Sequence, residues 1–506
     1  MYKHFYYKLR GDTIKKVFKT VALVTVFSCF ERFLGFLYRI FLSRKLGAEG
    51  IGMYQITLSV VGVLVTLTAS GTPITVSRLM LKARAKNNPQ TERDVISAGI
   101  FTSLLISLPI TIALYVFKSK LSFIFADPRC YDLLLVILPS IVLTSVYAVI
   151  RGVFWGNKNF LTYSLIELIE EVIMIVFGFF LVSKMTSIYD GTVRAGYSIF
   201  ISYVVSFVIS TTVFIVQGGK LTNPVKQFLP LIESSLPITL MRTGTSLISS
   251  LVAIILPMRL IATGLTSSDA LALYGELSGM TLPLLFIPST LIGSIALVLV
   301  PDISENFYKN NIEILKNKIS GAIKCSVLIS CLIFPTFIAC GREIGVLIYS
   351  NLNAGIMLSA SAIMMLPMSI TMITNSVLNS MNMEKKTLLF YLIGACFLLA
   401  FVWFLPSICG VYALIWGHIA SYVITAILNL VTLEHTFYKN ISYKKHLALS
   451  FLSALLSTFF GLFINGILSN FFGNLLVLII STVAVLIFDF ILMKIFSVFE
   501  FLKRVN

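Results

Sequence analysis

Charged side chains are scarce in this sequence. Asp, Glu, Lys and Arg make up only 12% of its 506 residues, whereas 57% are hydrophobic and the mean hydropathy is +0.94. A water-soluble domain of this length could not bury so much apolar surface. Because the apolar stretches are long and do not alternate, they exclude an outer-membrane barrel and predict an all-α protein that crosses the membrane many times.

Signatures of enzymes and metal sites are also lacking. The sequence contains neither GxxxxGK[ST] nor HExxH, its four histidines are scattered, and its seven cysteines form no CxxC pair. ATP hydrolysis and a metal site are therefore not expected, and no cofactor is expected beyond a coupling Na⁺ or H⁺. Residues 1–20 lack the apolar core and cleavage site of a signal peptide, and we interpret them as a basic cytoplasmic tail.

Basic residues outnumber acidic ones, which gives a formal net charge of +17. They are dispersed among apolar segments instead of forming a long tract, so nucleic acid is not an expected partner. They are better explained as residues of loops that face the cytoplasm and anionic lipid. The expected environment is the lipid bilayer of the plasma membrane.

Fourteen apolar segments are each long enough to cross a hydrocarbon core of roughly 30 Å. The tenth is overlong, and only its part near 355–378 needs to span. The segments run at about 21–42, 51–72, 95–117, 132–153, 160–183, 194–216, 229–256, 271–298, 319–340, 344–378, 387–405, 409–432, 446–469 and 472–497.

The distribution of Lys and Arg predicts the orientation. With the N-terminus in the cytoplasm, 27 of the 39 basic residues fall on the inner side and nine on the outer side, while three lie within spans. This bias favours an even number of spans with both termini inside.

An internal repeat is visible. Leu138-Pro139 and Leu366-Pro367 each begin a span at an offset of 228, and the same offset relates Pro73 to Pro301. Spans 1–6 thus recur as spans 7–12, which predicts two parallel six-helix lobes with a cavity between them. The alternative is that these apolar segments resemble one another by chance. The predicted parts are an N-terminal lobe at 21–220, a C-terminal lobe at 221–440, and two extra spans with a tail at 441–506.

Arginine occurs inside segments that are expected to span the membrane, where a charged side chain is unfavourable. Arg32 and Arg39 lie seven residues apart in the first span, on one helix face with Gly35 between them. A guanidinium holds phosphate bidentately and keeps its charge when buried, so this face suits a diphosphate, with Gly35 allowing close approach or bending. Alternatively, Arg39 snorkels to the interface, and Arg32 only pairs with Glu31 or another acid.

Four further arginines are candidates, and of these Arg242 is expected to bind the diphosphate together with Arg32 and Arg39. Arg242 opens the second lobe and could point at the same cavity as Arg32. Arg78, Arg151 and Arg259 are candidates for a cavity entrance, although snorkelling is the simpler explanation for Arg151 and Arg259.

Carboxylates gather in the fifth span. Glu167, Glu170 and Glu171 share one helix face, where they cannot all be ionised cheaply in an apolar setting. We expect a coupling site for H⁺ or Na⁺, or counter-charges for the arginines; a late start of the span, with Glu167 at the interface, is the alternative. Glu31 is a further candidate, and Glu276 and Asp489 are solitary ones.

The eighth span contains Gly279, Pro283 and Pro288. Proline interrupts the helical hydrogen-bond ladder, so this segment is expected to act as a hinge during alternating access. Packing alone also explains such residues in membrane helices.

Several motifs resemble the stage V sporulation protein B group, in the polysaccharide transporter branch of the multidrug/oligosaccharidyl-lipid/polysaccharide (MOP) flippase superfamily. They are Arg32-Phe33-Leu34-Gly35-Phe36, residues 44–55, Ala69-Ser70-Gly71-Thr72-Pro73, and residues 273–283. The resemblance implies a fourteen-span fold of two six-helix lobes plus two helices. It also implies export of lipid-diphosphate-linked sugars and a link to spore cortex peptidoglycan.

Lipid II flippases of this superfamily carry a similar Arg-x-Leu-Gly-Phe in their first helix, and the resemblance implies that Arg32 is needed. Their second arginine comes one residue earlier than Arg39, where this chain has Tyr38. In these relatives the last two spans border a groove for the lipid tail, whereas this chain carries Asp489 there.

Together, these features predict a flippase for an undecaprenyl-diphosphate-linked saccharide, with lipid II as the leading substrate. A cation-coupled multidrug exporter is one alternative, favoured by the carboxylates and disfavoured by the arginines. A non-transporting scaffold for cell-wall synthases is the other, and such synthases are also candidate partners of a flippase.

Overall fold

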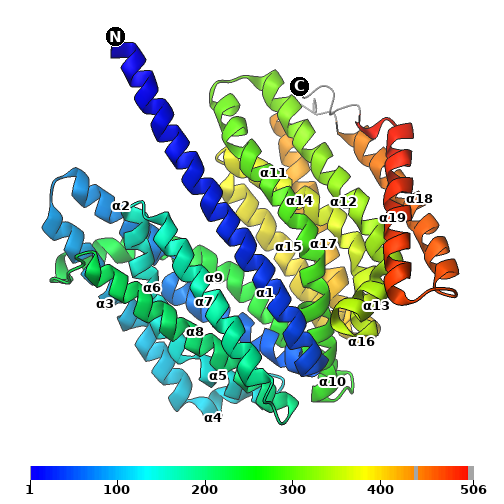
Figure 1. The fold of residues 1–506 in the computed structure, drawn as a ribbon, viewed down its shortest axis with the longest axis horizontal. Coiled ribbons are helices and arrows are strands. Elements are labelled where there is room, and N and C mark those ends of the chain that lie inside the picture. The colour runs from blue at the N-terminus through cyan, green and yellow to red at the C-terminus, as the bar shows by residue number, and fades with distance from the viewer. Residues whose placement is uncertain (1, 438–442, 500–506) are drawn as a thin grey trace. The chain divides into compact units, whose positions relative to one another are not determined.

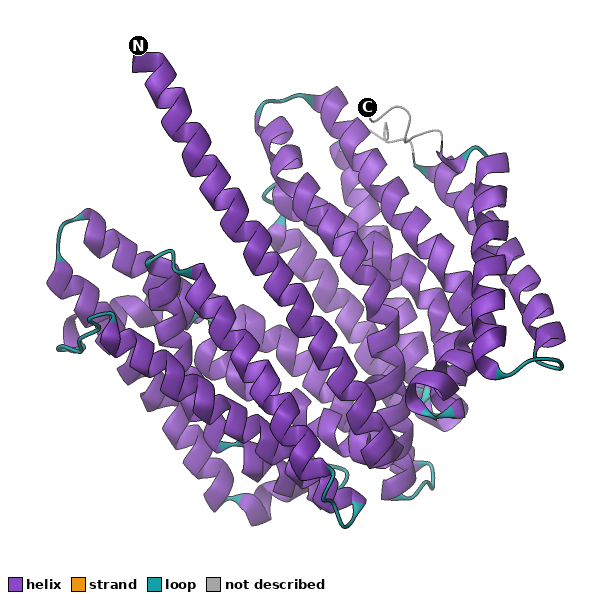
Figure 2. Cartoon of the chain, viewed as in Figure 1, coloured by secondary structure: helices purple, strands orange, loops and turns teal. Residues whose placement is uncertain are grey.

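The chain forms two compact units, residues 1–254 and 255–506. The computed structural model describes residues 2–437 and 443–499, and for residues 2–23 and 297–298 it describes only the backbone. The described residues form helices, turns and loops, without a strand (Figure 2). The predicted all-α class is therefore confirmed.

Unit 1 is built from nine helices and a short 3₁₀ turn (Figure 1, blue to green). They are α1 (Tyr2–Ala69), α2 (Thr72–Ala85), α3 (Pro89–Val116), α4 (Lys118–Leu121), the 3₁₀ turn Ser122–Ile124, α5 (Pro128–Ile137), α6 (Pro139–Gly156), α7 (Phe160–Val182), α8 (Ile188–Val216) and α9 (Val225–Ala262), which continues into unit 2.

Unit 2 contains the remaining helices (Figure 1, green to red). They are α10 (Ser267–Tyr274), a π-helical segment (Gly275–Thr281), α11 (Leu282–Tyr308), α12 (Ile312–Tyr349), α13 (Leu352–Ser361), the 3₁₀ turn Ala362–Met364, α14 (Met365–Ser380), α15 (Glu384–Phe404), α16 (Pro406–Cys409), α17 (Tyr412–Thr436), α18 (Lys444–Leu468) and α19 (Asn474–Ile495).

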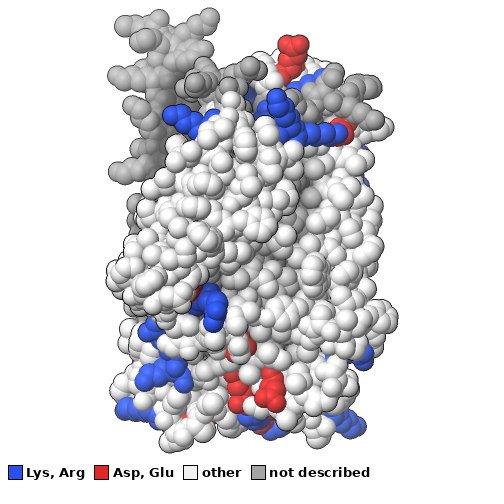
Figure 3. Space-filling model, turned by 90° about the vertical axis from the view of Figure 1, so that its right-hand side faces the viewer, with Lys and Arg blue, Asp and Glu red and all other residues white. Residues whose placement is uncertain are grey.

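Twelve stretches of the described residues are long and apolar enough to cross a membrane. The first two predicted segments fall in one of these stretches, because α1 continues through a bend at Gly47 (φ 66°). The segment 160–183 matches α7, which carries three glutamates and is not among the twelve. The multi-span class is thus confirmed, while the count of fourteen stays a prediction. On the face shown in Figure 3, charged side chains lie in the upper and lower parts of the view, and a broad uncharged band separates them.

One predicted boundary is wrong. We expected a break between residues 340 and 344, but α12 continues to Tyr349, and the turn comes at Ser350, which adopts a left-handed backbone (φ 56°). Gly341 and Gly345 explain the continuation, because both lie against α13 where that helix has Gly355. A Cβ at Gly341 would lie 2.8 Å from the Gly355 carbonyl oxygen, so these glycines serve helix contact, not a turn.

Matching turns occur in both units. Helices α2 and α11 both end in Lys-Asn-Asn, with Asn87 (φ 50°) and Asn310 (φ 55°) in the left-handed conformation. In each turn the next amide closes the helix: Asn88 donates to the Ala83 carbonyl at 3.1 Å, and Asn311 donates to that of Asn306 at 3.0 Å. The two turns are thus alike in sequence and in backbone conformation, while the internal repeat stays a prediction.

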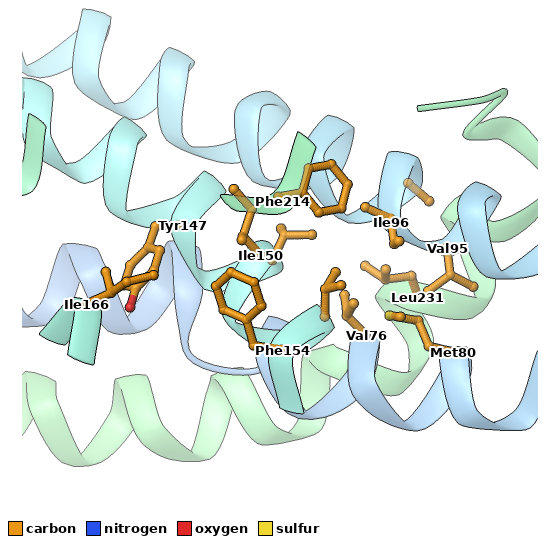
Figure 4. Packing of buried hydrophobic residues seen from close by; sticks show 13 residues of the cluster. Val76, Met80, Val95, Ile96, Tyr147, Ile150, Phe154, Ile166, Phe214 and Leu231 are labelled. Carbon is orange, nitrogen blue, oxygen red and sulfur yellow. The ribbon is translucent and has the colours of Figure 1, made fainter. Parts of the chain in front are cut away.

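The core of unit 1 is an apolar cluster contributed by α2, α3, α6, α7, α8 and α9 (Figure 4). Its labelled members include Val76, Ile96, Phe154, Phe214 and Leu231, all at most 6% exposed. Close approach of the helices depends on small residues. A Cβ at Gly152 would lie 2.7 Å from the carbonyl oxygen of Pro73, which fixes α6 against the start of α2.

Candidate functional site

Helix α1 turns one face toward α7 and α8. Tyr38 on that face is buried, and its hydroxyl shares a 3.1 Å hydrogen bond with Ser198 of α8. Gly178 of α7 provides the space, because a Cβ there would collide with the Tyr38 hydroxyl. This packing fixes the rotation of α1 about its axis and so decides where the neighbouring arginines point.

Arg32 lies on the exposed side of α1, and Arg39 is partly buried. Gly35, expected between them as a point of close approach or a hinge, lies instead against α7: a Cβ there would be 2.8 Å from Glu171 Oε1. The non-helical backbone inside α1 is at Gly47. The contact at Gly35 is thus with a carboxylate of the protein itself.

Four glutamates converge between α1 and α7, and we call Glu31, Glu167, Glu170 and Glu171 the carboxylate cluster. Glu31 of α1 lies within electrostatic range of Glu167, Glu171 and Arg32. The three glutamates of α7 share a face, as their spacing predicted. The sequence did not reveal that Glu31 joins them, because this requires the packing of α1 on α7.

Arg151 of α6 partly balances the cluster. Its Nη1 lies 3.4 Å from Glu167 Oε1, and the two side chains are 26% and 27% exposed. Its guanidinium also lies over the rings of Trp155 and Tyr163, at 5.6 and 5.9 Å from their centroids. Arg151 is thus held inside unit 1 by an acid and two aromatic rings. The aromatic partners could not be predicted from the sequence, apart from the i,i+4 spacing of Arg151 and Trp155.

Two carboxylate oxygens of the cluster, Glu31 Oε1 and Glu170 Oε2, are buried without a hydrogen-bond partner. A buried acceptor with no donor is costly, and a carboxylate can satisfy it by taking up a proton or a cation. The cluster therefore has the composition of a cation or proton site, as the sequence suggested. No group of three or more metal-ligating side chains is recognised as a metal site in the described chain.

Arg242 and Arg78 lie near the junction of α1 and α2. The chain breaks its helix at Ser70 and Gly71, and Arg242 Nη1 of α9 lies 3.4 Å from the Ser70 carbonyl oxygen. Arg78 of α2 donates to the Ser234 hydroxyl, also on α9. Both guanidinium groups remain largely exposed. They are placed together by α9, while Arg32 belongs to the other half of α1.

Arg259, near the end of α9, has a local structural partner. Its Nε donates to the Trp403 carbonyl oxygen at 2.9 Å, and its guanidinium lies 5.0 Å from the centre of the Trp403 ring. The arginine therefore caps the final turn of α15. This contact accounts for its position without a ligand.

Glu276 lies buried in the π-helical segment of unit 2, with 5% of its surface exposed. The side-chain amides of Asn351 and Asn353 donate to Glu276 Oε1 at 2.9 and 3.3 Å. Asn351 also caps α13 by accepting from the Ala354 amide at 2.8 Å. The carboxylate therefore joins the π-helical segment to the start of α13.

The predicted hinge residues of this region coincide with the change in helix type. Gly279 lies in the π-helical segment, Pro283 is in the first turn of α11, and Pro288 lies inside that helix. π-Helical turns widen the backbone ladder and occur frequently at functional sites. The structure thus shows a departure from regular α-helix where bending was expected.

Sequence reasoning missed an ion cluster beside the bend of α1. Arg129, at the start of α5, lies 2.7 Å from both Glu49 Oε1 and Asp127 Oδ2. The hydrogen bonds that the Arg129 guanidinium donates to Asp127 and then to Glu49 raise its pKa above the usual range. Nearby, the hydrogen bond to Asp132 raises the pKa of Lys118. These contacts secure the loop between α3 and α5 to α1.

Comparison with known proteins identifies the class. The model of the polysaccharide biosynthesis protein family matches residues 17–307, more than half of the sequence. The chain belongs to this family. Stage V sporulation protein B of Bacillus subtilis (strain 168) is 25% identical over 439 residues, which cover 83% of this chain and 84% of the relative.

The lipid II flippase MurJ is similar in both sequence and structure. The protein of Bacillus subtilis (strain 168) is 22% identical over 417 residues, covering 75% of each chain. A solved MurJ structure in an inward closed conformation matches with a TM-score of 0.71 at 16% identity, covering 96% of this chain and 100% of that one.

An inward-facing multidrug resistance MATE family transporter of the MOP superfamily matches with a TM-score of 0.67 at 16% identity, covering 81% of this chain and 94% of that one. The fold is therefore that of the MOP superfamily, and the resemblance seen in the sequence is confirmed. The lipid II flippase and the solved structures named here are transporters, in agreement with the class predicted from the sequence.

Proposed function

We propose that this chain is a flippase for a saccharide linked through diphosphate to a polyprenyl lipid, with lipid II as its substrate. The observation that carries the proposal is Arg32. It lies exposed on an apolar helix, and within the described residues it forms no ion pair with an acid. A guanidinium placed in this way can bind a phosphate oxygen pair.

Arg39 and Arg242 extend the proposed binding site. Arg39 lies two helical turns from Arg32, about 10 Å along the axis at 1.5 Å per residue. Arg242 holds only a long 3.4 Å contact to the Ser70 carbonyl, which a phosphate oxygen can replace. Arg78 would line the entrance. Arg151 and Arg259 are not included in the proposed site, because each contacts a protein partner, Glu167 and Trp403 respectively.

Alternating access would move the head group across the membrane while the prenyl tail stays in lipid. Changes in helix geometry at the π-helical segment would allow part of this movement. Moving a diphosphate through hydrocarbon is energetically unfavourable. Ion pairs with the arginines of the proposed site would offset this cost.

The carboxylate cluster is the proposed coupling site for a proton or Na⁺. Glu31 and Glu170 each present a buried oxygen without a donor, and either cation would satisfy it. Replacing Glu170 by Gln should abolish the dependence of transport on the ion gradient while Arg32 still binds substrate. Transport rates measured with imposed H⁺ or Na⁺ gradients distinguish the two ions; unchanged coupling in the variant would overturn this role.

We place the protein in the plasma membrane with both termini in the cytoplasm. A role in building spore cortex peptidoglycan, together with cell-wall synthases, belongs to the same proposal. It is supported by the similarity to stage V sporulation protein B.

A multidrug exporter is the second candidate, favoured by the carboxylate cluster, because cationic drugs require acidic sites. The two functions predict opposite effects of Arg32. Its loss should impair the transport of an anionic lipid and should leave the export of cations intact. A scaffold without transport activity should tolerate Arg32→Ala altogether.

Complementation tests the proposal directly. Cells depleted of their lipid II flippase would express the wild type, Arg32→Ala, or Arg194→Ala at matched membrane abundance. Arg194 is a suitable control because its charge is already paired, in an i,i+4 ion pair with Asp190 at the start of α8. Rescue by the wild type and the control, with failure of Arg32→Ala, supports the flippase; equal rescue by all three contradicts the role of Arg32.

A further inference from the structure

Helix α18 carries a buried polar stripe that the proposed function does not use. Ser450, Ser453, Ser457 and Asn465 are spaced by multiples of three or four residues and so share one face. All four are at most 8% exposed. This face packs against α12 and α19 in unit 2 (Figure 1).

The three helices approach closely along this stripe. A Cβ at Gly461 would lie 2.7 Å from Val485 Cγ2 of α19 and 2.8 Å from Ala339 Cβ of α12. Neither lipid nor a bulky ligand fits at such a contact. Any ligand held between these helices must therefore be very small.

Asp489 of α19 meets the stripe with a fully buried side chain, which is 0% exposed. The Ser457 hydroxyl donates to Asp489 Oδ1 at 2.9 Å, while Oδ2 has no hydrogen-bond partner. A carboxylate offers about four acceptor positions, of which a single hydroxyl covers one. The second oxygen is therefore aimed into the protein without a donor.

No basic side chain balances Asp489 in an ion pair within the described parts of the chain. From α12, the group that faces it is the Cys331 thiol. On α18, the basic groups are Lys444, Lys445 and His446, and the last of these lies eleven residues before Ser457, about 16 Å along the axis. On α19 itself, Lys494 follows five residues later, in the last turn.

An isolated ionised carboxylate in this place would cost several kcal/mol. Either a proton or a metal cation could neutralise the charge of this carboxylate. One carboxylate and one hydroxyl are too few oxygens for a hard metal cation, and the described residues hold no cluster of metal-ligating side chains here. A proton needs only one oxygen, and Oδ2 is available because Ser457 already occupies Oδ1.

We propose that Asp489 is a binding site for an exchangeable proton. An O–H bond forms at Oδ2, the charge of the carboxylate is neutralised, and Ser457 keeps its hydrogen bond to Oδ1. Ser453 and Ser450 continue the hydroxyl stripe from Ser457 toward the start of α18, and Ser450 Oγ is buried without a partner. These hydroxyls form a polar stripe that leads from Asp489 toward the start of the helix.

Infrared difference spectroscopy of the full chain in lipid nanodiscs tests this site. Acidification should produce a carbonyl band of a protonated carboxyl group, which shifts in deuterated water and is lost in Asp489→Asn. The control is Glu343→Gln, since Glu343 is also a buried acid and accepts from Asn465 of α18 at 3.1 Å. The Asp489 band should persist in this control.

Three outcomes would overturn the proposal. The acid-induced spectrum could be the same in Asp489→Asn as in the wild type. The Asp489 band could be present at every pH, which would indicate a permanently protonated structural residue. It could also disappear on addition of Na⁺ at constant pH, which would indicate a metal cation.

A second variant keeps the test valid if Asp489→Asn fails to fold. Ser457→Ala removes only the hydroxyl donor, so the Asp489 band should move to higher frequency. An unmoved band would contradict the assignment. None of these measurements depends on a saccharide substrate, so they remain informative if the proposed flippase function fails.

Discussion

Two kinds of arginine can be distinguished at the scale of single residues. Arg151 and Arg259 have partners that hold them in place, an acid with two rings in one case and a helix-terminal carbonyl in the other. Arg32 lies exposed on α1 without an ion-pair partner in the described chain. Intramembrane charge without a structural partner is the stronger indicator of ligand binding.

The Arg151–Glu167 pair should contribute measurably to stability. A double-mutant cycle with Arg151→Gln and Glu167→Gln should give a coupling energy of about 0.5–2 kcal/mol, because both side chains are partly buried. The Arg194–Asp190 pair is the control, for which we expect a smaller coupling energy, because i,i+4 pairs at the end of a helix contribute little. Chemical unfolding in detergent measures both; equal coupling in the two pairs would contradict the account.

Gly178 should be intolerant of a side chain. Gly178→Ala forces Tyr38 away from Ser198 and should destabilise the protein by about 1–3 kcal/mol. Gly321→Ala is the matched control, since no atom lies within 4 Å of the added Cβ and Ala favours the helix. Melting temperatures in detergent should fall for the first variant only; a stable Gly178→Ala protein would show that α1 is not held by this contact.

At the scale of elements, most helices could be predicted from the sequence, because each corresponds to an apolar segment long enough to span a membrane. Where the prediction of an element was wrong, contacts between helices determined the observed structure. The predicted segments 319–340 and 344–378 left a break between them, yet Glu343 is buried against Asn465, more than a hundred residues away, and the helix continues. Glu31 was predicted as a candidate of the same kind as the glutamates of α7, but its place beside them could not be predicted, since it depends on Gly35 packing against Glu171.

The junction between the π-helical segment and α13 provides a test at this scale. Asn351→Ala removes both the cap of α13 and a donor to buried Glu276, and should cost more than a cap alone, about 2–3 kcal/mol. Asn311→Ala is the control, because Asn311 begins α12 without a side-chain cap. Unfolding free energies compare the two; a similar loss in both would show that the Glu276 contact contributes little.

At the scale of the whole molecule, the distribution of basic loops predicts the topology. Lys86 and Lys120 are both exposed, and they follow α2 and α3 in turn. In a background without the seven native cysteines, Lys86→Cys should react only from the cytoplasmic side and Lys120→Cys only from outside. Labelling of intact cells with a membrane-impermeant maleimide measures this; reaction of both positions from one side would contradict the predicted orientation.

The fold of the whole chain matches transporters of the MOP superfamily, which carry different substrates. Fold alone therefore does not select the substrate. The selection in this account comes from the charge of α1, where Arg32 is exposed without an ion-pair partner among the described residues and Glu31 lies close to the carboxylates of α7.

The most direct test of this account is lipid II translocation by the purified chain in liposomes. The wild type and Arg194→Ala should move a fluorescent lipid II analogue between leaflets, whereas Arg32→Ala should be slower by about 10- to 100-fold, as expected for loss of a charge-assisted hydrogen bond. Equal rates for the wild type and Arg32→Ala, in proteoliposomes of equal protein content, would contradict the claim that Arg32 binds the diphosphate.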